Sequence, residues 1–289
     1  MSLKTEAVAL VKAGLTEVRS NVEVVLLSAG LVVIAQLVAA SLLVLLFADV
    51  QMDRVAEAVA TLQGQMQVAE PDAGAMQDAL GALLPLVAAG ILSYLVAFPL
   101  FPVVWSRVVI KGRAGARQMD QGEGWLGLYA GALGRVLIGL VPFVLLLIIA
   151  LIGVLMLSGL VGPVFMLLGL GSAGGFILQL LQSVVLAAVF SLFYAGLGLS
   201  LAGASVRQGP GVFGALRHVV DQDRRLLVAV VIVSVAVTLA NQVAVLAGAL
   251  LPLAAVLLYL AFWVVSTALN LAVCALAWRD EAERDTAAF

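Results

Sequence analysis

Side chains that could transfer a proton come closest together in the stretch that holds His218, Asp221 and Asp223. An acid–base enzyme needs titratable groups of this kind held next to its substrate. The chain has one histidine and one cysteine, which excludes a disulfide framework and a metal site built from several His and Cys ligands. A lipid-modifying membrane enzyme is therefore the least favoured of three hypotheses. We expect no catalytic residue, no metal and no cofactor.

Two glycine strings have the spacing of a nucleotide-binding motif. They are Gly122, Gly124 and Gly127, in QGEGWLG, and Gly209, Gly211 and Gly214, in QGPGVFG. A dinucleotide site needs a strand before the motif and a βαβ unit around it, whereas the segments beside these strings are strongly apolar. We interpret both as turns that let the chain leave one helix and begin another. A weaker alternative is that free N–H groups there meet a lipid phosphate.

The composition defines the class of protein. Apolar residues make up 64% of the 289 residues and charged residues 11%, against roughly 45–50% and about 25% in soluble domains. This excludes a water-soluble enzyme and indicates an all-α, multi-pass membrane protein.

Stretches without charge give the membrane spans, since each crossing needs about 20 apolar residues. Four such stretches occur, and two of them are long enough for a pair of helices. Chain turns are expected in the Gly/Pro-rich segment that begins at Gly159 and around Gly248–Pro252. The predicted spans are 24–48, 80–106, 134–158, 177–204, 226–248 and 253–278.

Basic residues predict the orientation, because cytoplasmic loops retain Lys and Arg. Except for Arg54, they all fall in the N-terminal arm, loops 107–133 and 205–225, the adjoining span ends and the tail. Loop 49–79 is acidic and is expected outside. We therefore expect one six-helix membrane domain over 1–289, with both termini in the cytoplasm. Arginine far outnumbers lysine, and Ala, Gly, Val and Leu are abundant. This composition is typical of a GC-rich bacterial genome and favours the inner membrane of a bacterium.

Amphipathic segments precede the odd-numbered spans. Val8, Val11, Leu15, Val18 and Val22 form an apolar stripe in the N-terminal arm, which we expect to lie at the cytoplasmic interface, in lipid or against the bundle. Residues 212–220 and the segment from Trp125 to Leu133 have the same design. The chain thus reads as a direct repeat of interfacial helix, inward-to-outward span and return span. Direct repeats disfavour, weakly, an alternating-access carrier.

This plan, with the segment GVFGALRHVVDQDRRLL, resembles the six-helix membrane domain of bacterial glycerophosphodiester phosphodiesterases and its stand-alone inner-membrane relatives. The resemblance covers nearly the whole chain. It implies a six-helix fold and a membrane setting. It implies no catalysis, because the chain lacks the acids and histidines of a phosphodiesterase domain.

Arginines near the ends of the spans are candidates for lipid head-group contacts, because each basic side chain near an anionic surface contributes about 1 kcal/mol. The favoured alternative is that they only fix the topology. Trp105, Trp125 and Trp278 are interpreted as an interfacial belt. The candidate head-group residues are Arg19, Arg117, Arg135, Arg207, Arg217, Arg224 and Arg225.

Neutral polar residues remain inside the spans, where we find no central Asp, Glu, Lys or His. Proton relays and ion-coupled pumps depend on such ionisable groups. The outer-half residues Gln179, Gln182, Asn241, Gln242 and Tyr259 are expected to meet between spans four, five and six. Hydrogen bonding between helices is the favoured reading, and a pocket for a lipid or small solute is the alternative.

Uncharged or amphipathic segments outside the spans indicate partners. Segment 51–68 has an apolar stripe that would dock on the bundle or on another subunit, and connection 159–175 carries no charge. We expect a non-enzymatic scaffold or accessory subunit that organises lipids or a partner complex. The alternative is a transporter or lipid-moving protein. Partners would be membrane lipids, anionic phospholipid above all, and a second membrane protein, with no nucleic acid.

Overall fold

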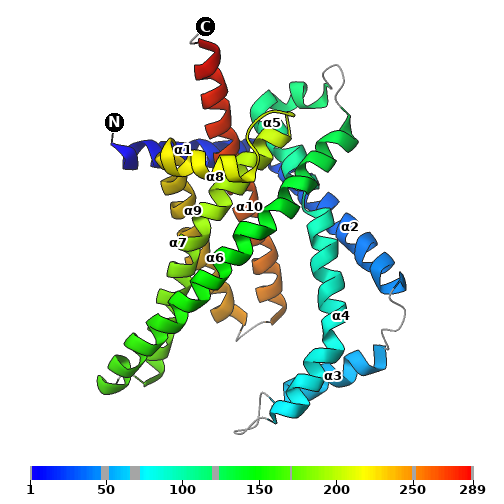
Figure 1. Ribbon diagram of the computed structural model, residues 1–289, viewed down its shortest axis with the longest axis vertical. Coiled ribbons are helices and arrows are strands. Elements are labelled where there is room, and N and C mark those ends of the chain that lie inside the picture. Colours follow the sequence, from blue (N-terminus) through cyan, green and yellow to red (C-terminus); the bar gives the residue numbers. More distant parts are fainter. Residues whose placement is uncertain are drawn as a thin grey trace. The chain divides into compact units, whose positions relative to one another are not determined.

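The computed structural model describes residues 2–46, 52–65, 72–118, 124–169, 171–248 and 252–287. All regular structure in these residues is helical (Figure 1). The helices are α1 (Leu3–Ser20), α2 (Val22–Leu46), α3 (Met52–Gln65), α4 (Ala73–Ala97), α5 (Leu100–Arg117), α6 (Trp125–Leu167), α7 (Gly171–Ala204), α8 (Val212–Asp221), α9 (Arg224–Gly248) and α10 (Pro252–Ala287).

The chain is an all-α, multi-pass membrane protein. Six helical segments are long and apolar enough to cross a bilayer, and each overlaps one predicted span. They are Val22–Leu45, Ala73–Arg117, Trp125–Val164, Ile177–Ala204, Arg224–Gln242 and Val256–Glu283.

Several boundaries differ from the prediction. The predicted span 80–106 is divided between α4 and α5, α7 begins earlier, at Gly171, and α10 continues to Ala287. Helix α6 differs at both ends. The helix continues through the Gly/Pro-rich segment after Gly159 and ends only at Leu167, with Pro163 inside it. At its other end it begins at Trp125, so 125–133 is not a separate interfacial helix. In lipid every backbone group must bond within the helix, and this favours continuing a helix through Gly and Pro. At about 1.5 Å per residue, its 43 residues span about 65 Å and exceed an apolar core of about 30 Å.

The helices form two compact units, Met1–Ser28 with Phe101–Phe289, and Ala29–Leu100. In the smaller unit α3 packs on α4, with Ala58 and Ala79 buried. The Asp72 side chain caps α4, because its Oδ1 accepts from the N–H of Gly74 at 2.8 Å. The amphipathic segment predicted at 51–68 is helical over Met52–Gln65, while the rest of loop 49–79 lies partly outside the described residues. A single domain over 1–289 stays a prediction.

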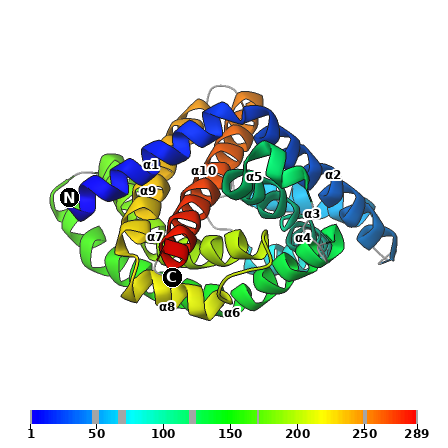
Figure 2. The same ribbon diagram turned by 90° about the horizontal axis from the view of Figure 1, so that it is seen from above.

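In the larger unit α7 packs against α6, α8, α9 and α10, and α9 pairs with α10. Both α1 and α8 lie across one end of the long helices (Figures 1 and 2). Helix α1 packs on α9 and α10 through Ala7, Leu10 and Gly14. Leu15, from the predicted apolar stripe, is instead 48% exposed. The small residues face the bundle because they allow the helix backbones to approach closely.

Candidate functional site

A fully buried arginine connects two helix ends in the larger unit. Arg107 of α5 has no exposed surface. Its guanidinium donates to the carbonyl oxygens of Ala116 at 3.2 Å, Ser205 at 3.0 Å and Gln118 at 2.8 Å. Helix α5 turns at Gly112, where φ is 72°, and this turn brings the carbonyls of 116 and 118 back to the arginine. Charge-assisted bonds of this kind are stronger than neutral ones.

The second end that Arg107 holds is the segment after α7, residues 205–211, which we call the hook. It reverses sharply, because the N–H of Gln208 donates to the carbonyl of Gly203 at 2.8 Å. The turn uses two left-handed residues, Arg207 at φ 54° and Gly209 at φ 95°. A Cβ at Gly209 would lie 3.0 Å from the Trp278 ring, so only glycine fits the close approach.

Further bonds fix the hook from α6 and α7. Arg135 of α6 donates to the carbonyl oxygens of Ser200 and Gly209. The Ser200 hydroxyl donates to the carbonyl of Pro210 at 3.1 Å. Since Gly211 then begins α8 as its N-cap, the second glycine string forms the predicted turn into a new helix. In the first string, Gly122 lies outside the described residues.

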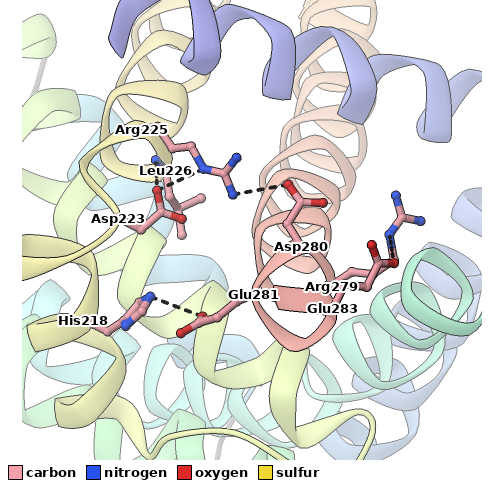
Figure 3. Close-up of polar contacts among 8 residues, drawn as sticks. All are labelled: His218, Asp223, Arg225, Leu226, Arg279, Asp280, Glu281 and Glu283. Atoms are coloured by element: carbon pink, nitrogen blue, oxygen red, sulfur yellow. Dashed lines mark hydrogen bonds and ion pairs between the residues drawn. The ribbon is translucent and has the colours of Figure 1, made fainter. Parts of the chain in front are cut away.

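Ion pairs hold the end of α10 against α8 and α9 (Figure 3). Arg225 contacts Asp280 at 3.2 Å and Asp223 at 3.3 Å. The Asp223 carboxylate also caps α9 by accepting the N–H of Leu226 at 3.1 Å.

The three acid–base candidates are directed to different partners. His218 lies 3.2 Å from Glu281, Asp221 pairs with Arg217 at 3.3 Å, and Asp223 pairs with Arg225. The His218 contact joins α8 to α10, whereas the contacts of Asp221 and Asp223 are with residues only four and two positions away along the chain. They do not bring the three side chains to one substrate position.

A cavity of about 300 Å³ opens beside the hook, between the end of α5 and the end of α10. Its lining carries charges of both signs. Lys111 of α5 and Arg279 of α10 are cationic, and Glu283 of α10 is anionic, with its Oε1 atom 3.9 Å from the Arg279 Nε atom. Arg279 also donates to the carbonyl of Val109 at 3.5 Å. The lining residues are Ile110, Lys111, Val206, Gln208, Trp278, Arg279, Ala282 and Glu283.

The seven candidate head-group arginines have different surroundings. Arg135 binds one carbonyl of α7 and one of the hook, and Arg225 is paired with two carboxylates. Arg207 lies over Gly127 of α6, where a Cβ would meet its guanidinium. The other four are exposed, namely Arg19, Arg117, Arg217 and Arg224. None of the seven lines the cavity.

Sequence reasoning missed the cavity's own cations, Lys111 and Arg279. Their signal was weak, because it consisted of a Lys directly before the turn at Gly112 and an Arg directly after Trp278. It also misplaced Trp105, which is buried and donates to the carbonyl of Ala268 at 2.7 Å. Trp125 is 51% exposed, and its place in an interfacial belt stays a prediction.

The five neutral polar residues predicted to meet between spans four, five and six have different surroundings. The Gln182 amide donates to the Ser158 hydroxyl of α6 at 2.7 Å, and Asn241 has a buried Oδ1 atom without a hydrogen bond. Gln179 and Tyr259 are exposed. In the part of the chain that the structure describes, no hydrogen bond joins two of the five residues Gln179, Gln182, Asn241, Gln242 and Tyr259.

Among the described residues, no three His, Cys, Asp or Glu side chains gather as metal ligands. Comparison with known proteins gives no family model, no curated protein and no solved structure that matches this chain.

Proposed function

We propose that this protein is a non-enzymatic membrane scaffold or accessory subunit that organises phospholipids, and that it holds a lipid phosphate in the cavity beside the hook. The observation that carries the proposal is a cavity lined by two cationic side chains, Lys111 and Arg279, at the ends of membrane-spanning helices. A phosphate group lies at this depth in a bilayer, and basic side chains near it contribute about 1 kcal/mol each.

The rest of the lining fits the same ligand. Trp278 has the amphipathic ring that is enriched at head-group level, and Gln208 offers an amide to the ester oxygens. Ile110, Val206 and Ala282 give an apolar wall for the glycerol and the start of an acyl chain. A strongly hydrated solute would find less to bind there, because an apolar wall offers it no hydrogen bonds.

We assign this end of the bundle to the cytoplasmic face of a bacterial inner membrane, with both termini inside. The support is that basic residues concentrate there, as cytoplasmic loops require. Labelling a single cysteine introduced at Ser2 in intact cells tests the assignment. An impermeant maleimide should leave it unlabelled until the membrane is opened, and labelling of intact cells would reverse the topology.

Retention of phospholipid through purification tests the binding site. Protein released from lipid nanodiscs is examined by native mass spectrometry, and wild type should keep one phospholipid. Lys111→Gln with Arg279→Gln removes both cations, and we expect the bound fraction to fall about tenfold or more, since two contacts of about 1 kcal/mol are lost.

The matched control removes two exposed arginines at the same end, Arg217→Gln with Arg224→Gln. It changes the net charge equally and leaves the cavity intact, so retention should stay at the wild-type level. Equal losses in both double variants would mean diffuse attraction instead of a site. Unchanged retention in the cavity variant would refute the proposal, and thermal melts of all three proteins exclude simple unfolding.

The transporter hypothesis is less well supported. It needs the neutral polar residues to face one space, whereas Gln182 bonds to Ser158 of α6. Leucine at Gln182 and Asn241 should abolish flux of a transported solute if these amides form its binding site, and unchanged flux would leave them as packing groups.

A further inference from the structure

We propose that the cavity selects a head group that carries an amine beside its phosphate, namely phosphoethanolamine, over anionic head groups without an amine. This inference rests on the proposed function, because it concerns which phospholipid the same cavity holds. The observation behind it is that a carboxylate, Glu283, lines the cavity together with Lys111 and Arg279.

The cavity lining has a cationic and an anionic side chain close together. The Arg279 Nε and Glu283 Oε1 atoms are 3.9 Å apart. Phosphoethanolamine has a matching pair of charges, an anionic phosphate joined by a short two-carbon link to an ammonium group. Its phosphate can lie at Arg279 and Lys111 while its ammonium lies at Glu283, so the head group joins both members of the Arg279–Glu283 ion pair.

A purely anionic head group lacks that match. The phosphate of phosphatidylglycerol would meet the same two cations, but its glycerol offers the Glu283 carboxylate no positive charge. The carboxylate would also repel the phosphate, and like charges brought together act as a device of specificity.

The indole of Trp278 adds a second attraction for an ammonium group. Tryptophan is the side chain that binds cations best over its ring face, and Trp278 lines the cavity together with Glu283. Its ring is positioned by the hook, since it lies against Gly209. The aromatic wall and the carboxylate thus occur on one helix, α10.

The backbone that carries the Glu283 carboxylate is held in place before any lipid binds. The neighbouring residues Asp280 and Glu281 are paired with Arg225 of α9 and His218 of α8, both at 3.2 Å (Figure 3). A site that is already ordered spends less conformational entropy on binding. Preorganisation of this kind favours discrimination between two ligands of similar size.

Competition between two lipids in one nanodisc tests the inference. Wild-type protein is incorporated into discs of equal phosphatidylethanolamine and phosphatidylglycerol, and the lipid that it retains is identified by native mass spectrometry. We expect phosphatidylethanolamine to be retained about fivefold more often. Glu283→Gln should bring the ratio close to one, while Asp221→Asn, an equal charge change on α8, should leave it unchanged.

A second measurement does not depend on any variant. Soluble glycerophosphoethanolamine should displace the retained lipid from wild-type protein at lower concentration than glycerophosphoglycerol. A preference for phosphatidylglycerol in wild type, or an unchanged ratio in Glu283→Gln, would overturn the inference and leave a phospholipid site in place. Retention of neither lipid would overturn the proposed function as well.

Discussion

Replacing Arg107 by methionine should destabilise the protein more than any other arginine substitution in the larger unit. Methionine keeps most of the apolar stem but leaves the carbonyls of Ala116, Gln118 and Ser205 without this donor. Hydrogen bonds to a charged group contribute roughly 1.5–3 kcal/mol each, and a buried acceptor left without a donor costs about 1–3 kcal/mol, so the three acceptors together give a loss of about 3–5 kcal/mol. We expect a loss in that range.

Arg107→Lys is the informative intermediate. Lysine keeps the positive charge, but its single ammonium cannot present the fixed fork that reaches three carbonyls at once. The free energy of unfolding of Arg107→Lys should therefore lie between those of wild type and Arg107→Met, about 1–3 kcal/mol below wild type. A stability that decreases in the order arginine, lysine, methionine would show that the geometry of the donor contributes as well as its charge.

Thermal melting in a mild detergent measures the series. At about 2 °C per kcal/mol for a chain of this size, Arg107→Met should lower the apparent melting temperature by roughly 6–10 °C. Arg217→Met is the control, because Arg217 is exposed, with a side chain 86% accessible, and substitution there costs at most about 0.5 kcal/mol. Equal melting of the two methionine variants would refute the structural role of Arg107.

Three further predictions concern the same unit. Gly209→Ala should destabilise by about 2–4 kcal/mol, since a left-handed alanine is strained and the new methyl group has no room, and melting measures it. Gly14→Leu should lift α1 from the bundle, because even a Cβ there lies 2.9 Å from a Val273 methyl, and trypsin should then release the N-terminal arm faster. A double-mutant cycle of Arg225→Ala and Asp280→Ala should give a coupling of about 0.5–2 kcal/mol, because the pair is partly buried.

The controls separate local from general effects. Gly153→Ala serves both glycine substitutions, because nothing lies within 4 Å of a Cβ there, and it should melt at or above the wild-type temperature. Wild-type stability of Gly209→Ala, wild-type tryptic release of Gly14→Leu, or additive effects of Arg225→Ala and Asp280→Ala would each contradict the contact concerned.

The membrane spans could be predicted because the signal is local and long. Each apolar stretch without charge is long enough, as a helix, to cross a bilayer core. Hydropathy alone therefore locates membrane-spanning segments such as Ala73–Arg117 and Arg224–Gln242. The turn after α6 was predicted too early because glycine and proline break helices in water. In lipid the backbone has no other donor or acceptor, which favours continuing the helix to Leu167.

The cavity could not be read from the sequence, because its walls come from segments far apart in the chain. Lys111, Gln208 and Arg279 meet only when α5 turns at Gly112 and the hook folds back after α7. Both events depend on positive φ angles, which residue types indicate only weakly. Arg107 was likewise read as one more positive charge, since nothing local reveals that carbonyls from 116, 118 and 205 surround it.

The acceptors that Arg107 and Arg135 use are peptide carbonyls, which every amino acid carries. Evolutionary drift in the side chains of residues 205–208 therefore leaves these bonds unaltered, while drift at the two arginines removes them. Related proteins can therefore differ in the side chains of residues 205–208 and keep the same path of the hook, provided that Gly209 is retained. When side chains of arginine bond to backbone carbonyls in this way, the amino-acid sequence around the carbonyls can change extensively while the fold is retained.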